Sequence, residues 1–114
     1  MDISIAGFFG NSPRRDLTFV RDFAQTIEGF GFRTLSLPEH VVFFPEYESD
    51  YPYTDDGEPN WGPDTGIFDP LFVAQAAAHA TTTLRFITGV LILTQRPALL
   101  TAKEVLRSEE HTSE

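Results

Sequence analysis

Two titratable residues, Glu39 and His40, directly follow a short apolar segment of the chain. In residues 33–37 leucines alternate with small polar residues, which predicts a strand with one apolar face. Pro38 ends this strand, because proline cannot donate a hydrogen bond to a neighbouring strand. Sites in parallel α/β folds form beyond the carboxyl ends of the strands. We therefore interpret Glu39 and His40 as candidate catalytic residues.

Histidine suits proton transfer, because the ordinary imidazole pKa of about 6.5 lies near neutral pH. A structural interpretation also exists for each candidate. On the residues alone His40 is a structural loop histidine, and Glu39 is a partner that holds its neighbours in place. Both interpretations stay open at this level.

Residues 41–66 are rich in proline, aromatic and acidic residues. A structureless segment of this length in a compact domain is usually functional or mobile. Two interpretations are equally supported. The segment is either a solvated surface excursion that packs its own rings, or a lid over a site beside Glu39 and His40.

Apolar periodicity and turn residues predict alternating strands and helices. Ser12 and Pro13 have the sequence of a helix start, and Gly31 is placed to end that helix in a left-handed turn. Asp69 and Pro70 repeat the same start before a second helix. The predicted strands are residues 3–8, 33–37 and 84–93, and the later helices are residues 71–80 and 97–106. Such alternation predicts a parallel sheet covered by helices.

Residues 84–93 form an almost continuous apolar run. This pattern is typical of a parallel strand that is buried on both faces. Gly89 interrupts the run, and a glycine within a strand often marks a bulge or the close approach of a ligand. A plain bulge with no ligand is the alternative.

The composition excludes several classes of function. The 114 residues carry a net charge of −9 with a pI near 4.6, which argues against nucleic acid or an anionic membrane as partner. No apolar run approaches the ~20 residues of a membrane span. The absence of cysteine excludes disulfides and thiolate metal ligands and is consistent with a cytoplasmic protein. We expect a small-molecule substrate and no metal site.

Several short motifs occur in the order found in a known family. They are Gly31-Phe32, Leu37-Pro38-Glu39-His40-Val41-Val42, Tyr51-Pro52-Tyr53, Asp69-Pro70-Leu71, Thr81-Thr82-Thr83-Leu84-Arg85 and Thr88-Gly89-Val90-Leu91-Ile92-Leu93. With these motifs the chain resembles the luciferase-like monooxygenase superfamily, and within it most the deazaflavin (coenzyme F-420)-dependent oxidoreductases. The resemblance implies that residues 1–106 are the first three strand–helix units of a TIM (β/α)8 barrel, which takes ~250 residues when complete.

The resemblance also implies roles for particular residues. By analogy His40, with Glu39 beside it, lies near the cofactor ring as an acid/base. Thr88, Gly89 and Val90 are the implied cofactor-binding residues, with a non-proline cis peptide bond at Gly89–Val90. The implied cofactor is coenzyme F-420. Flavin mononucleotide (FMN) is the alternative, because FMN-dependent monooxygenases share much of the pattern.

The activity implied by the resemblance is hydride transfer between the cofactor and a small organic substrate that no residue identifies. The parent protein is then expected to be an enzyme and a homodimer. The 114-residue chain alone is expected to be inactive, because the later barrel units are missing. The alternative from another class is a non-catalytic α/β module that binds a partner through its aromatic segment.

Residues 107–114 depart from the family pattern. Their sequence, Arg-Ser-Glu-Glu-His-Thr-Ser-Glu, can be encoded by AGATCGGAAGAGCACACGTCTGAA, which resembles the start of a widely used sequencing adapter. We therefore expect residues 107–114 to be a non-native tail produced by adapter read-through, and we leave them out of the fold prediction.

Overall fold

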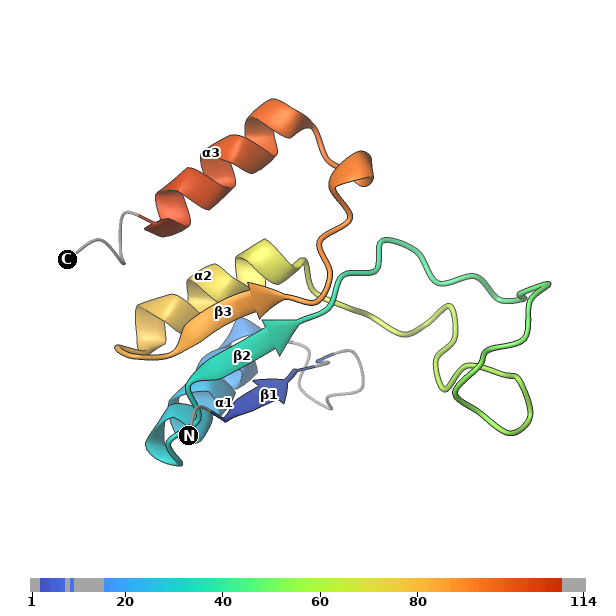
Figure 1. The fold of residues 1–114 in the computed structure, drawn as a ribbon, viewed down its shortest axis with the longest axis horizontal. Coiled ribbons are helices and arrows are strands. Elements are labelled where there is room, and N and C mark those ends of the chain that lie inside the picture. Colours follow the sequence, from blue (N-terminus) through green and yellow to red (C-terminus); the bar gives the residue numbers. More distant parts are fainter. Residues whose placement is uncertain (1–2, 8, 10–15, 110–114) are drawn as a thin grey trace.

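The computed structural model describes residues 3–7, 9 and 16–109 of the chain as a parallel three-stranded sheet with helices (Figure 1). The elements are β1 (Ser4–Ala6), α1 (Leu17–Gly29), β2 (Thr34–Leu37), α2 (Pro70–Ala80), β3 (Arg85–Thr88), a 3-10 turn (Leu93–Gln95) and α3 (Ala98–Glu109). The strands follow one another across the sheet in the order β1-β2-β3. The predicted α/β class and parallel sheet are confirmed. No helix within the described ranges is long and apolar enough to cross a membrane.

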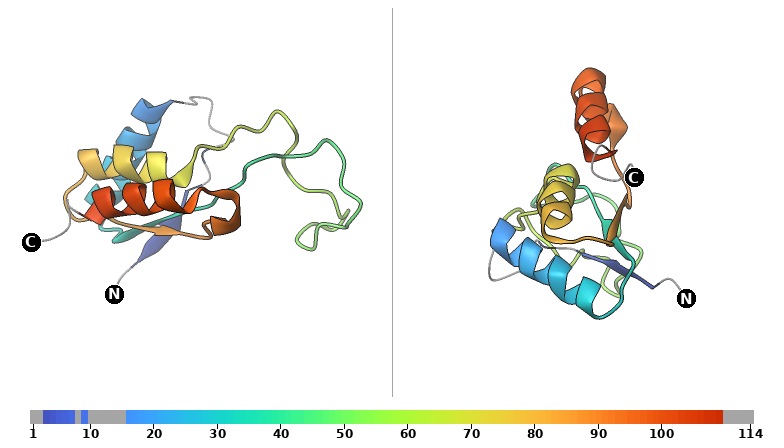
Figure 2. Two further views of the ribbon diagram at one scale, coloured as in Figure 1. Left: turned by 90° about the horizontal axis from the view of Figure 1, so that it is seen from above. Right: turned by 90° about the vertical axis from the view of Figure 1, so that its left-hand side faces the viewer.

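The register of the sheet places apolar residues on one face. Leu35 in β2 lies between Ile5 of β1 and Phe86 of β3. Side chains alternate along a strand, so Leu37 shares this face with Leu35. Both leucines are almost fully buried, because α1 and α2 lie together on this side of the sheet (Figure 2).

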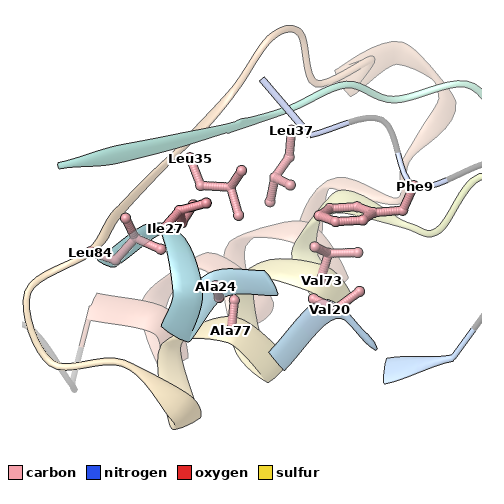
Figure 3. Close-up of a cluster of buried hydrophobic side chains, with 9 residues drawn as sticks. All are labelled: Phe9, Val20, Ala24, Ile27, Leu35, Leu37, Val73, Ala77 and Leu84. Atoms are coloured by element: carbon pink, nitrogen blue, oxygen red, sulfur yellow. The ribbon is translucent and has the colours of Figure 1, made fainter. Parts of the chain in front are cut away.

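The hydrophobic core lies between β2 and the two helices that cover it (Figure 3). Each helix contributes residues spaced three or four apart, which is the spacing of one helical face. The core residues are Phe9, Val20, Ala24, Ile27, Leu35, Leu37, Val73, Ala77 and Leu84. The small side chains of Ala24 and Ala77 allow α1 and α2 to pack closely against each other.

Helix α1 begins and ends at residues with clear local causes. Asp16 caps its start, since the Asp16 carboxylate accepts the backbone N–H of Phe19 at 2.8 Å. Ser12 and Pro13, predicted to start a helix, lie outside the described residues. At the other end Gly31 has a φ of 87°, and its N–H donates to the carbonyl of Glu28 at 2.9 Å. The predicted left-handed turn at Gly31 is confirmed.

Helix α2 begins as predicted. Asp69 is its N-cap, and the Asp69 carboxylate accepts the N–H of Leu71 at 2.9 Å. Pro70 occupies the first turn, where its missing N–H costs nothing because that group has no partner inside a helix.

The turn between α2 and β3 is held by Glu28 at the end of α1. One carboxylate oxygen of Glu28 accepts the N–H groups of Thr82 at 2.9 Å, Thr83 at 2.6 Å and Leu84 at 3.0 Å. The Thr83 hydroxyl donates to the same oxygen at 2.9 Å. Glu28 therefore fixes the entry of β3 relative to α1, a role that the sequence analysis did not predict.

The prediction for the third strand is wrong in two respects. β3 ends at Thr88, whereas the apolar run predicted a strand through residue 93, because the chain leaves the ladder at Gly89 and turns over the next residues. β3 is also the edge of the sheet, and the side chain of Ile87 is 55% exposed. Among the described residues, no helix covers the face of β3 that carries Ile87, so β3 is not buried on both faces.

Helix α3 carries apolar residues that no other described element covers. Leu99 is 84% exposed and Leu106 is 62% exposed. The helix runs to Glu109, three residues past the predicted end at Leu106. The expected tail therefore begins within α3, and residues 110–114 lie outside the described residues.

Candidate functional site

The sequence candidates gather at the carboxyl ends of two neighbouring strands. Glu39 and His40 follow β2, and Gly89 and Val90 follow β3. Leu37 pairs with Thr88 at the end of the ladder. The N–H of Gly89 donates to the carbonyl of Leu37 at 2.8 Å, which keeps the two exits side by side. In Figure 1 the connection after β2 and the turn after β3 leave the sheet from this same edge.

The carboxylate of Glu39 is buried and fully engaged. Its side chain is 6% exposed. One oxygen accepts the backbone N–H of Ile92 at 2.5 Å. The other oxygen accepts Nε of Arg96 at 2.8 Å and also Nη2 of Arg96. Glu39 thus ties the end of β2 to the turn that follows β3.

Arg96 extends this ion pair to the start of α2. Its Nη2 donates to Oδ2 of Asp69 at 2.5 Å, while the other oxygen of Asp69 caps α2. Nη1 of Arg96 lies 3.8 Å from Glu104 of α3. Burial acts to lower the pKa of Arg96, but the hydrogen bonds and charges of Glu39 and Asp69 outweigh it, so the pKa is raised. Arg96 stays charged and joins three elements.

This network supports the structural interpretation of Glu39. Both of its oxygens already accept hydrogen bonds, so the carboxylate is held as a positioning group. Arg96 is not among the site residues predicted from the sequence. The available signal was that Arg96 is the one cation between Arg85 and Lys103, beside a turn close to the candidate carboxylate.

His40 differs, because its ring is exposed and only its Nδ1 has a partner among the described residues. Nδ1 lies 3.1 Å from the carbonyl oxygen of Val42. A carbonyl oxygen only accepts hydrogen bonds, so Nδ1 carries the proton and Nε2 holds the lone pair of the neutral ring. The imidazole stacks on Phe43, with ring centroids 4.3 Å apart and 20° between the ring planes. His40 is thus oriented as a proton acceptor at Nε2.

Thr88, Gly89 and Val90 form the corresponding exit from β3. The peptide bond between Gly89 and Val90 is cis, as the family resemblance predicts. A Cβ added at Gly89 would lie 2.8 Å from the Oγ of Ser36, so a side chain does not fit there without movement. Thr88 is half-buried, whereas Val90 is 69% exposed.

The connection of residues 41–66 has internal structure. It forms an open pocket of about 130 Å³ that is lined in part by His40 and Trp61. The N–H of Tyr51 donates to the carbonyl of Gly57 at 2.7 Å, and the Thr54 hydroxyl donates to the carbonyl of Glu58 at 2.8 Å. The rings of the connection also pack on one another, as Tyr51 and Trp61 do, so its structure fits the surface excursion as well as the lid. Glu39 lies outside this pocket, in the ion-pair network.

A metal site is not evident in the parts of the chain that the structure describes. Those residues contain no group of three or more His, Asp or Glu side chains placed to hold an ion. The carboxylates of Glu39 and Asp69 converge on Arg96 instead.

Comparison with known proteins gives relatives without a described activity. No model of a known protein family matches the chain. The chain is similar to uncharacterized proteins of Mycobacterium bovis and of the CDC 1551 and H37Rv strains of Mycobacterium tuberculosis. Each is 33% identical over 89 residues, which are 78% of this chain and 31% of the relative. The chain spans about a third of the length of the curated relatives it matches.

Proposed function

We propose that the chain is the amino-terminal part of a deazaflavin (F-420)-dependent oxidoreductase of the luciferase-like superfamily, built on a TIM barrel. The observation that carries this proposal is the meeting of two strand exits. His40 after β2 and the segment Thr88–Val90 after β3 lie at the same sheet edge, where barrel enzymes place their sites.

The proposal also accounts for the open surfaces of the chain. Ile87 on the sheet and Leu99 on α3 are exposed apolar side chains that further strand–helix units would cover. The relatives are about three times as long as the segment that matches, which is close to the ~250 residues of a complete barrel.

The described residues fit a flat ring system at this edge. Gly89 is exposed, and Val90 presents an exposed apolar side chain next to it. Thr88 ends the strand beneath them. Bound deazaflavin supplies hydride transfer at its central ring. We assign Thr88, Gly89 and Val90 to holding the cofactor.

His40 is assigned the proton transfer. Its Nδ1–H is held by the carbonyl of Val42, which leaves Nε2 as the acceptor that faces solvent or substrate. Glu39 serves as a positioning residue, because its ion pair with Arg96 fixes the backbone from which His40 projects.

Two other functions remain as alternatives. An FMN-dependent monooxygenase uses the same scaffold, and none of the described residues distinguishes FMN from F-420. A non-catalytic binding module has support from the aromatic pocket after β2. The exposed apolar side chains of Ile87 and Leu99 weigh against a self-contained module.

The deciding experiment uses the complete reading frame recovered from the source DNA. The protein is purified from a host that makes both cofactors, and the released cofactor is identified by its absorption spectrum and mass. We expect deazaflavin. FMN alone would favour the monooxygenase. A protein that binds neither, together with cooperative unfolding of the soluble 114-residue chain, would favour the binding module.

A further inference from the structure

The pocket in the connection after β2 combines aromatic rings with a carboxylate. Rings of His40, Tyr47, Tyr51 and Trp61 line a volume of about 130 Å³, and Asp50 lies in the same wall. Trp and Tyr rings present negative faces to a ligand. Such a lining differs from an ordinary apolar pocket, because the Tyr and Trp rings and the Asp50 carboxylate are favourable to positive charge.

The rings are held in place before any ligand arrives. Tyr51 and Trp61 meet edge to face with centroids 4.9 Å apart. The hydroxyl oxygen of Tyr47 accepts the N–H of Phe44 at 3.0 Å. Phe43 is buried beneath the stacked ring of His40. A pocket that is already ordered loses little side-chain entropy when it binds.

The charged residues of the connection after β2 have one sign. The sequence contains no lysine or arginine between Arg33 and Arg85. The connection itself carries the acids Glu46, Glu48, Asp50, Asp55, Asp56, Glu58 and Asp64. A surface lined by one sign of charge concentrates ligands of the opposite sign.

The geometry points to a binding site for a small organic cation, such as a quaternary ammonium group. The Tyr and Trp rings that line the pocket would hold the cation, and Asp50 would compensate its charge. A bare metal ion fits less well, since the described residues offer no cluster of three ligating side chains. The inference concerns binding alone, and it does not depend on the cofactor chemistry proposed above.

Choline and its neutral isostere 3,3-dimethylbutan-1-ol provide the test. Trp61 is the single tryptophan of the chain, so its fluorescence reports on this pocket directly. In titrations of the 114-residue chain we expect choline to change the emission and to bind at least about threefold more tightly than the isostere. Added NaCl should weaken choline binding and leave the isostere unaffected.

Two matched variants localise the charge effect. Asp50→Asn removes a pocket carboxylate and is expected to weaken choline binding about fivefold. Asp55→Asn removes the same charge from an exposed position outside the lining, and a change below about twofold is expected. Far-ultraviolet circular dichroism checks that both variants keep their helices.

Three results would overturn the inference. They are no choline-dependent change in Trp61 emission, equal affinity for choline and the isostere, and equal effects of the two variants. The comparison of ligands on the unmodified chain decides the matter even where a variant fails to fold.

Discussion

Glu39 and Arg96, 57 residues apart, form an ion pair with two nitrogen donors on one carboxylate oxygen. The Glu39 side chain is 6% exposed and that of Arg96 is 12% exposed. Through this pair, hydrogen bonds connect the end of β2, the turn after β3 and the N-cap of α2 at Asp69. A polar network therefore holds the candidate site in position, in addition to the apolar core.

Glu39→Gln is expected to destabilise the chain by about 3 kcal/mol. Breaking one side of a buried pair typically costs 3–5 kcal/mol, and the lower end applies here because Arg96 keeps Asp69 as a charge partner. Urea unfolding followed by circular dichroism measures the change. Glu104→Gln is the control, because Glu104 is 40% exposed and 3.8 Å from Arg96, so less than about 1 kcal/mol is expected. Equal losses in the two variants would contradict the network.

The lowered pKa of Glu28 predicts that the folded chain loses stability in acid. The pKa of Glu28 is lowered from 4.5, mainly by the N–H of Thr83, against an opposing effect of burial. The unfolded chain binds the proton more tightly, so stability rises with pH through this range. The contribution of Glu28 is complete above pH 4.5 and is lost as the pH falls through the lowered pKa of the folded state.

The measurement compares Glu28→Gln with the unmodified chain. At pH 7 we expect the variant to be less stable by about 1–3 kcal/mol, the usual contribution of hydrogen bonds to a charged acceptor. The difference should shrink as the pH is lowered below 4.5. Glu46→Gln, an exposed acid of the connection after β2, serves as the control for net charge. A difference that stays constant with pH would disprove the role of the Glu28 charge.

Local rules were sufficient for parts of the fold. Gly31 and Asp69 were correctly placed at a helix end and a helix start, because each effect depends on a few neighbouring residues. The partnership of Glu28 with Thr83, 55 residues away, depends on how α1 packs, which no local pattern encodes. Arg96 was missed for the same reason.

The error in the third strand has a physical cause. Its apolar run predicts burial on two faces, yet exposed apolar residues also occur where a protein packs against another element. Ile87 is exposed because the described residues put nothing against that face of β3. An apolar run therefore indicates side chains that favour burial. It does not indicate which element, in this chain or another, packs against them.

Gly89→Ala is expected to destabilise the chain by about 1–3 kcal/mol. The added Cβ would lie 2.8 Å from Oγ of Ser36, and such overpacking costs this amount where the neighbour cannot move. If position 89 were an ordinary strand position, Gly89→Ala would instead stabilise the chain, because alanine lowers the entropy of the unfolded chain relative to glycine.

A double-mutant cycle with Ser36→Ala isolates this contact. Ser36→Ala removes the Oγ atom, so Gly89→Ala should cost less in that background. The free energy of unfolding of all four proteins gives the coupling. If the two substitutions simply add, the close approach of Ser36 to position 89 is not what excludes a side chain.

His40→Ala tests the proposed chemistry in the completed protein. We expect turnover to fall by ~100- to 10,000-fold, the usual contribution of a general acid or base. Cofactor affinity should change little, because His40 is assigned to proton transfer and the segment after β3 to holding the cofactor. Steady-state kinetics and a cofactor titration measure the two quantities separately.

His79→Ala is the matched control for that experiment. His79 is also exposed, but it lies in the last turn of α2, whereas the candidate site follows the carboxyl ends of β2 and β3. The control should keep its turnover, so that a loss confined to His40→Ala assigns the effect to the ring stacked on Phe43. Unchanged turnover in His40→Ala would return His40 to a structural role in the connection after β2.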